Sequence, residues 1–240
     1  MHIFLTGTVQ IGKTTVIDKT LALLGVTAGG FRSYFGADRH CPSHHYLYMS
    51  SAAESRAFTQ EHAIVEFSED AEGNPRRIVL PRFEELGLQY LAQASAYPLI
   101  ILDECGRLEQ RFPRFCAQVL ELLEGETPVL GVVRQDVMGW LEEIRHHPKV
   151  QLVTVTEQNR NELPQQLADR LCAEEGFVLI HLDPPCDAPR QSVRRVIFSP
   201  NTVKQRKQIS SSSGVTHSVN CREKVSCTAR PRRMTGAALS

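Results

Sequence analysis

The stretch Gly7-Thr-Val-Gln-Ile-Gly12-Lys13-Thr14 decides how the rest of this chain is interpreted. Its fixed residues follow the spacing G-x-x-x-x-G-K-[ST], which is typical of a loop that binds phosphates. At this spacing successive backbone N–H groups point into one anion-sized cavity, and the glycines permit the necessary backbone angles. Lys13 adds a mobile ammonium, and the hydroxyl of Thr14 is a ligand for Mg²⁺. The pattern therefore predicts a binding site for the phosphates of a nucleotide.

The residues on either side place this loop between a strand and a helix. His2–Thr6 is a short apolar run and is predicted to be a strand buried on both faces. In Thr15–Leu24 apolar residues recur at helical spacing, and Gly25 is a typical helix stop. A helix that begins at the loop would add the positive end of its dipole to the phosphate site. The nucleotide-binding residues predicted in this segment are Gly7, Thr8, Val9, Gln10, Ile11, Gly12, Lys13, Thr14 and Thr15.

A second motif combines a buried strand with two acids. In Leu99-Ile-Ile-Leu-Asp103-Glu104 four apolar residues precede two carboxylates, which are then expected at the carboxyl end of a strand. Ligands of open parallel sheets bind at that edge. Asp103 is predicted to hold Mg²⁺ together with Thr14, and Glu104 to orient the attacking water and accept its proton. The alternative interpretation is that both acids only cap the strand in solvent.

Three arginines are candidates for stabilising the charge that develops on a transferred phosphoryl group. Arg107 lies three residues after Glu104, and Arg134 and Arg160 each follow a predicted strand. Each of the three could equally form a surface ion pair. Arg160 is included among the predicted nucleotide-binding residues.

Strands and helices alternate along most of the chain. Strands are predicted at Leu99–Leu102, Val129–Val133 and Val150–Val155, and helices from Pro81 and at Phe112–Leu123, Val137–Ile144 and Leu163–Leu171. This alternation predicts an α/β protein with a mostly parallel central sheet between layers of helices. Together with the phosphate-binding motif, it predicts the three-layer fold of P-loop NTPases. A β-rich insertion or edge hairpin is predicted from three short runs at Tyr46–Met49, Ala63–Phe67 and Arg77–Leu80. Residues 177–182 are predicted as one further strand.

Charge divides the chain into two parts. Residues 184–240 contain 11 lysines and arginines but only 2 acids, which gives a net charge of +9. Residues 1–183 contain 16 lysines and arginines and 25 acids, which gives a net charge of −9. A proline-rich stretch and a serine run lie at or beyond this boundary. We therefore predict a P-loop domain over 1–183 and a basic, disordered tail over 184–240. The tail is interpreted as solvated chain, with contact to nucleic acid as the alternative.

The composition excludes several classes of protein. Apolar runs are far shorter than the ~20 residues of a membrane span, and no basic and apolar leader follows Met1. The seven cysteines form no CxxC pair, which favours reduced thiols in a cytoplasmic protein. His40, Cys41, His44 and His45 lie together, but no second pair of metal ligands is evident, so a polar loop is favoured over a metal site.

The motifs together resemble the small P-loop nucleoside-triphosphatases first described from thermophiles, a family that includes the cancer-related nucleoside-triphosphatase of animals. The resemblance covers about residues 1–172. It is carried by Gly7–Thr14, Asp103–Glu109, Leu141–Arg145 and Val155–Asn161, and Leu80–Glu84 is similar to the helix entry of the family.

This resemblance implies an activity and roles for individual residues. Members of the family hydrolyse nucleoside triphosphates, such as ATP and GTP, to diphosphates with Mg²⁺, broad base specificity and slow turnover. By position, Lys13 would bind phosphate and serve catalysis, and Glu104 would be the catalytic acid–base. Thr14 and Asp103 would bind the metal. Asn159–Arg160 would lie near the base or ribose.

The sequence departs from the family pattern at three places. Phe35 stands where the segment after the first helix usually ends in an acid, and Cys105 replaces an isoleucine or valine. The loop interior, residues 8–11, lacks the proline and the second glycine that are often found there. These departures concern substrate preference and rate more than nucleotide binding.

Two other functions use the same scaffold. A nucleotide or small-molecule kinase needs an acceptor pocket and often an arginine-bearing lid, and no lid-like insertion flanks the strand predicted at 129–133. The adjacent acids Asp103 and Glu104 also favour hydrolysis. A nucleotide-gated binding module would use the basic tail on a polyanion in a salt-sensitive way. The sequence indicates neither a membrane partner nor an oligomeric state.

Overall fold

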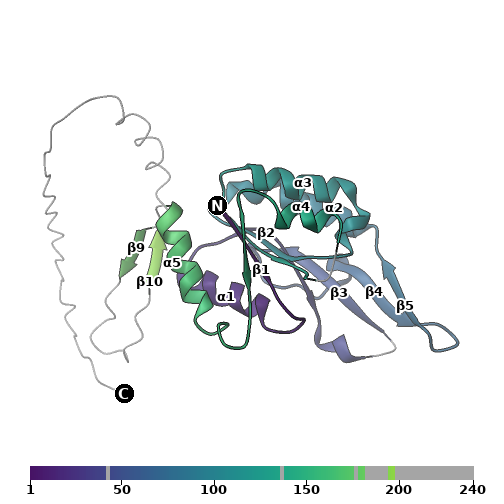
Figure 1. Cartoon of the computed structure of the whole chain (residues 1–240). Helices are drawn as coiled ribbons and strands as arrows, with labels where there is room; N and C mark the ends of the chain where they lie inside the picture. Colours follow the sequence, from purple (N-terminus) through teal and green to yellow (C-terminus); the bar gives the residue numbers. More distant parts are fainter. Residues whose placement is uncertain (42–43, 136–137, 176–177, 182–193, 198–240) are drawn as a thin grey trace, which may run out of the picture. The chain divides into compact units, whose positions relative to one another are not determined.

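The fold is built around one eight-stranded sheet (Figure 1). The structure is a computed structural model of the 240-residue chain, and it describes residues 1–41, 44–135, 138–175, 178–181 and 194–197. The strands lie in the order β5-β4-β3-β2-β6-β7-β1-β8. Their bounds are β1 His2–Thr6, β2 Gly29–Phe35, β3 His44–Ser51, β4 Ala63–Glu69, β5 Pro75–Val79, β6 Ile100–Cys105, β7 Val129–Val133 and β8 Val150–Thr154.

The sheet has a parallel part and an antiparallel part. β2, β6, β7, β1 and β8 run parallel to their neighbours in that series. β3, β4 and β5 continue the sheet beyond β2 as antiparallel strands. The α/β fold with a mostly parallel sheet and a β-rich insertion is therefore confirmed. Because parallel strands end at a common edge, β1 and β6 deliver the phosphate loop and the two acids to the same side of the sheet.

Helices cover both faces of this sheet. Figure 1 shows α1 and α5 on one face and α2, α3 and α4 on the other. The bounds of the helices are α1 Lys13–Leu24, α2 Arg82–Ala92, α3 Pro113–Glu124, α4 Trp140–Arg145 and α5 Leu163–Glu175. Short 3₁₀ helices are η1 Ala37–His40, η2 Gln60–His62, η3 Ala94–Ala96 and η4 Glu109–Arg111.

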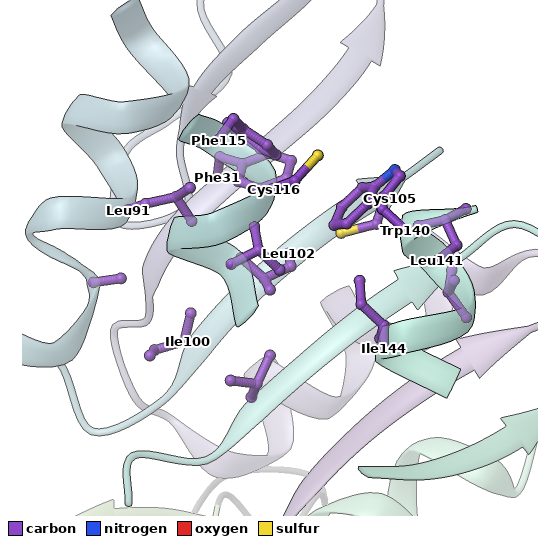
Figure 2. Packing of buried hydrophobic residues seen from close by; sticks show 14 of the residues in the cluster. Phe31, Leu91, Ile100, Leu102, Cys105, Phe115, Cys116, Trp140, Leu141 and Ile144 are labelled. Carbon is purple, nitrogen blue, oxygen red and sulfur yellow. The ribbon is translucent and has the colours of Figure 1, made fainter. Parts of the chain in front are cut away.

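Each face of the sheet has its own apolar core. Ile3 and Leu5 of β1 pack in the core under α1 and α5, whereas Phe4 packs in the core on the opposite face. In that second core, Phe115 of α3 and Trp140 of α4 lie over the sheet (Figure 2). The continuous apolar run of β1 therefore fills both cores, as expected of a central parallel strand.

Two glycines set local details of this fold. The helix predicted over Val137–Ile144 begins only at Trp140, because Gly139 before it has a left-handed φ of 94° that does not continue a helix. In β2, Gly30 has a φ of 88°, and a Cβ there would lie 2.1 Å from the carbonyl oxygen of Ile101 in β6. Glycine at position 30 therefore permits β2 and β6 to approach.

The C-terminal part of the chain is described at two strands only. β9 Val178–His181 pairs antiparallel with β10 Arg194–Ile197. β9 lies within the strand predicted at 177–182, and β10 lies in the predicted tail, 184–240. The rest of that tail is outside the described residues, so the boundary at 183 stays a prediction. Among the described helices, none has the length and apolar character to cross a membrane.

Candidate functional site

The loop between β1 and α1 folds into a tight turn. Gly7 and Gly12 have φ angles of 133° and 106°, and Gln10 between them has 65°. A Cβ on Gly7 would lie 2.7 Å from the carbonyl oxygen of Val155, so the loop lies directly against the segment after β8. The positive φ angles of Gly7 and Gly12 are conformations that glycine adopts without steric cost, and these are the glycines that the sequence pattern requires.

The side chain of Lys13 is folded over this loop. Its Nζ donates hydrogen bonds to the carbonyl oxygens of Gly7, at 3.0 Å, and Thr8, at 2.9 Å. Lys13 is 9% exposed and begins α1, whose first N–H groups have no acceptor within the helix. An ammonium and a helix N-terminus thus flank one turn, an arrangement that suits an anion.

The two acids of β6 differ in their surroundings. Asp103 is 2% exposed, and burial raises the pKa of its carboxyl to about 6, although a hydrogen bond from Thr14 opposes that shift. Thr14 Oγ1 donates this bond to Asp103 Oδ1 at 3.3 Å. The other carboxylate oxygen, Oδ2, is buried and has no hydrogen-bond partner in the structure. The hydroxyl of Thr14 and the carboxylate oxygen Oδ2 of Asp103 are both oxygen ligands of the kind that a hydrated divalent cation binds.

Glu104 lies next to Asp103 but reaches solvent. Its side chain is 36% exposed, and Oε1 is 3.6 Å from Nε of Arg134. The hydroxyl of Ser33 in β2 donates to the carbonyl oxygen of Asp103 at 3.2 Å and accepts from the N–H of Glu104 at 3.3 Å. Ser33 thereby fixes the backbone that carries both acids.

The three candidate arginines lie in different places. Arg160 Nη1 donates to the carbonyl oxygen of Ile11 in the phosphate loop, at 3.4 Å. Arg134 is placed beside Glu104, whereas Arg107 is exposed in the turn after β6. The side-chain amide of Asn159 bonds to the backbone of Thr154 and Thr156, so it shapes the loop that carries Arg160.

Known proteins resemble this chain in both sequence and fold. A family model described as NTPase matches residues 2–168. The chain belongs to this NTPase family. A protein named nucleoside-triphosphatase THEP1, from Thermofilum pendens, is 31% identical over 183 residues, which cover 72% of this chain and 96% of that protein.

Two solved structures resemble this NTPase-family chain. The solution structure of a human cancer-related nucleoside triphosphatase has a TM-score of 0.54 at 25% identity, and the match covers 72% of this chain and 98% of that one. The crystal structure of THEP1 from Aquifex aeolicus has a TM-score of 0.53 at 22% identity, with 71% and 99% covered. The match to this second structure shows a shared fold.

Some residues at the NTPase site are not among the site residues predicted from the sequence. Arg32 of β2 pairs with Asp18 of α1, and its positive charge opposes the rise in the pKa of Asp103 that burial causes. Ser33 is likewise absent from the predicted set. Phe35 replaces the acid of the family pattern, and its ring packs against that of Phe67 in β4, with 5.7 Å between the two ring centroids. Arg32 and Ser33 lie in β2, and the sequence of so short a strand does not indicate which strands lie beside it in the sheet.

The described side chains of the histidine-rich segment at 40–45 make local polar contacts. No group of three or more His, Cys, Asp or Glu side chains in the described residues could hold a metal ion. His45 Nδ1 instead contacts the carbonyl oxygen of Cys41 at 2.8 Å, and His44 Nε2 lies 3.2 Å from Glu66. The described side chains thus have the local contacts of a polar loop, while residues 42–43 lie outside the description.

Proposed function

We propose that this NTPase-family protein hydrolyses nucleoside triphosphates to nucleoside diphosphates and phosphate, with Mg²⁺ as its cofactor. The observation that carries the proposal is the hydrogen bond of 3.3 Å from Thr14 to Asp103, which joins the phosphate loop to the strand that bears the acids. A triphosphate in the loop would therefore lie beside both carboxylates. The names of the relatives support the same reaction.

The loop would bind the phosphates through backbone N–H groups and through Lys13. The ammonium now donates to two backbone carbonyls of the loop, and phosphate oxygens would be stronger acceptors because they are charged. Mg²⁺ would be held by the hydroxyl of Thr14 and, directly or through water, by Oδ2 of Asp103. When bound, the ion neutralises charge on the β- and γ-phosphates.

Glu104 would orient the attacking water and accept its proton. Its carboxylate reaches solvent, whereas that of Asp103 is buried, so the two neighbouring acids are suited to different tasks. Arg134 restricts the orientation of Glu104 through the contact at 3.6 Å. We also propose slow turnover, which the family resemblance implies.

We also propose broad base specificity, with ATP and GTP both as substrates. Arg160, the arginine that reaches the phosphate loop, contacts the backbone oxygen of Ile11. The amide of Asn159 is engaged with its own loop, so it is not available to read the edge of a base. Contacts to the phosphates, which all four nucleotides share, would then dominate binding.

The test is a phosphate-release assay with ATP, GTP, CTP and UTP, each with Mg²⁺ and with a chelator. We expect release without an acceptor for all four nucleotides and loss of release with the chelator. Lys13→Ala should abolish nucleotide binding, because the main countercharge of the loop is removed. Glu104→Gln should retain binding and slow hydrolysis by about 10²–10⁴-fold.

A matched control is Glu121→Gln, which changes an exposed acid on α3 and should leave hydrolysis at the wild-type rate. Phosphate transfer that occurs only after an acceptor is added would indicate a kinase. A Glu104→Gln protein with wild-type turnover would contradict the role proposed for Glu104.

A further inference from the structure

The buried carboxyl of Glu109 has no role in the reaction proposed so far. Glu109 begins the 3₁₀ helix η4, shortly after β6 ends, and it is 5% exposed. Burial raises the pKa of this carboxyl to about 7. Acids are rarely buried without a specific set of hydrogen bonds, because removing a carboxyl from water costs free energy. The position therefore calls for a structural or functional reason.

The carboxyl holds the turn that follows the two acids of β6. Glu109 Oε2 accepts a hydrogen bond from the N–H of Gly106 at 2.8 Å. On the other side of the same residue, Trp140 Nε1 of α4 donates to the carbonyl oxygen of Gly106 at 3.3 Å. Figure 2 shows the indole of Trp140 beside Cys105, immediately before this turn. Side chains from η4 and α4 thus hold Gly106 by both of its backbone polar groups.

The turn is in direct contact with Arg134. A Cβ on Gly106 would lie 3.1 Å from Cδ of Arg134 and 3.4 Å from Oε2 of Glu109, so both side chains lie against the α-carbon of Gly106. The N–H of Arg134 also donates to the carbonyl oxygen of Cys105 at 3.1 Å. Arg134 in turn lies 3.6 Å from Glu104. A continuous series of contacts therefore leads from the buried carboxyl to the exposed one.

Charge links the same groups. The negative charge of Glu104 raises the pKa of Glu109, and the positive charge of Arg134 lowers it. The thiols of Cys105 in β6 and Cys116 in α3 are buried. Burial, and after it the negative charge of Glu109, raises the pKa of both thiols. Cys116 Sγ also donates to the backbone oxygen of Glu109 at 3.2 Å, which fixes η4 against α3.

We propose that Glu109 is a positioning residue that acts through Gly106 and Arg134 on the carboxylate of Glu104. The inference rests on the proposed function, because it takes Glu104 as the group that orients the attacking water. Glu109 touches no reacting atom in this scheme. It keeps the turn in one conformation, so that Arg134 and Glu104 keep one geometry. A displacement of about 1 Å at a catalytic group can cost roughly 10²-fold in rate.

The experiment compares Glu109→Ala, which removes the hydrogen-bond acceptor, with Glu109→Gln, which retains an amide oxygen for the N–H of Gly106. We measure kcat for ATP with Mg²⁺, the Kd for ATP, and the melting temperature. Glu109→Ala should lower kcat by about 10- to 100-fold while Kd stays within about threefold, because the phosphate loop is not altered. Glu109→Gln should return kcat to within about threefold of the wild type. Glu121→Ala, an exposed acid on α3, is the control and should have wild-type kcat.

A double variant separates positioning from simple stabilisation. In a protein that already carries Glu104→Gln, adding Glu109→Ala should lower kcat by less than about a further threefold, because the effect of Glu109 passes through Glu104. The inference would be overturned if Glu109→Ala lowered kcat equally in the wild-type and Glu104→Gln proteins, or if Glu109→Ala had the wild-type kcat. It would also be overturned if Glu109→Gln were as slow as Glu109→Ala.

A second variant keeps the test valid should Glu109→Ala fail to fold. Trp140→Phe removes the other hydrogen bond to Gly106. This variant should likewise lower kcat while the Kd for ATP stays unchanged, and a wild-type kcat would overturn the inference. A Glu104→Gln protein with wild-type kcat would instead refute the proposed function, whatever Glu109→Ala does.

Discussion

At the scale of single residues, His2 shows how a polar side chain is used inside the fold. His2 has no exposed surface, and its Nδ1 accepts a hydrogen bond from the N–H of Val129 at 3.2 Å. Nε2 therefore carries the proton and donates to the carbonyl oxygen of Leu123 at 2.9 Å. Burial lowers the pKa of His2 from 6.5 to about 4. A protonated ring could not accept from Val129, so the neutral form belongs to the folded state.

This arrangement predicts how stability depends on pH. Because the pKa of His2 is lower in the folded than in the unfolded chain, the unfolded chain binds the proton first as pH falls below about 6.5. The contribution of His2 to the free energy of unfolding should therefore fall by up to about 3 kcal/mol between about pH 6.5 and pH 4. The raised pKa values of Asp103 and Glu109 act in the opposite direction, so the contribution of His2 is the difference between the wild type and a His2 variant. The measurement is the melting curve at several pH values for the wild type and for His2→Gln, which should lose this part of the slope. His146→Gln, at a side chain that is 77% exposed, should keep it.

The residues of the phosphate site could be predicted because their spacing is short and local. Gly7–Thr14 and Asp103–Glu104 are contiguous motifs, so sequence alone predicts their proximity within a parallel sheet. Arg134 is one of the three predicted candidate arginines, but its contact with Glu104 and the role of Ser33 could not be predicted in the same way. Their contacts depend on which strands lie beside β6, and β2 and β7 join it from distant parts of the chain.

At the scale of secondary-structure elements, the contact between β2 and β6 depends on Gly30. A Cβ at this position would meet the backbone oxygen of Ile101 at 2.1 Å, and the backbone cannot withdraw as a side chain could. Gly30→Ala should therefore lower the free energy of unfolding by about 3 kcal/mol or more. Denaturant unfolding measures this change.

Gly73 provides the matched control for that prediction. Its φ of 80° resembles that of Gly30, but nothing lies within 4 Å of a Cβ there. Gly73→Ala should therefore cost only the backbone strain, about 1–2 kcal/mol. Equal losses for the two variants would show that the backbone angle, and not the approach of the strands, determines the stability of β2.

Most elements could be predicted from hydrophobic pattern, and the exceptions have local causes. The strands and helices from residue 99 onward lie close to their predicted ranges because each has a clear apolar period. The late start of α4 follows from Gly139, whose conformation the sequence does not specify. The antiparallel edge β3–β5 is predicted from sequence only as a β-rich insertion or an edge hairpin, because short strands do not indicate their partners.

At the scale of the whole molecule, the proposed domain boundary at 183 is open to a direct test. All described site residues lie before it, so a chain of residues 1–183 should hydrolyse ATP within about twofold of the full-length rate. A chain of residues 1–200 retains β10, the partner of β9, and serves as the comparison. If only the longer chain is active, the domain includes β10, and if neither is active, the basic tail takes part in folding or function.

The strand order also determines when the nucleotide site can form. β1 contains the first residues of the chain, yet its two neighbours in the sheet are Val129–Val133 and Val150–Thr154. During synthesis the phosphate loop therefore has no neighbouring strands to support it until more than a hundred further residues have followed. Such long-range pairing slows folding, because the entropy of closing a large loop must be overcome first. The phosphate loop is thus synthesised well before the strands that allow it to bind a nucleotide.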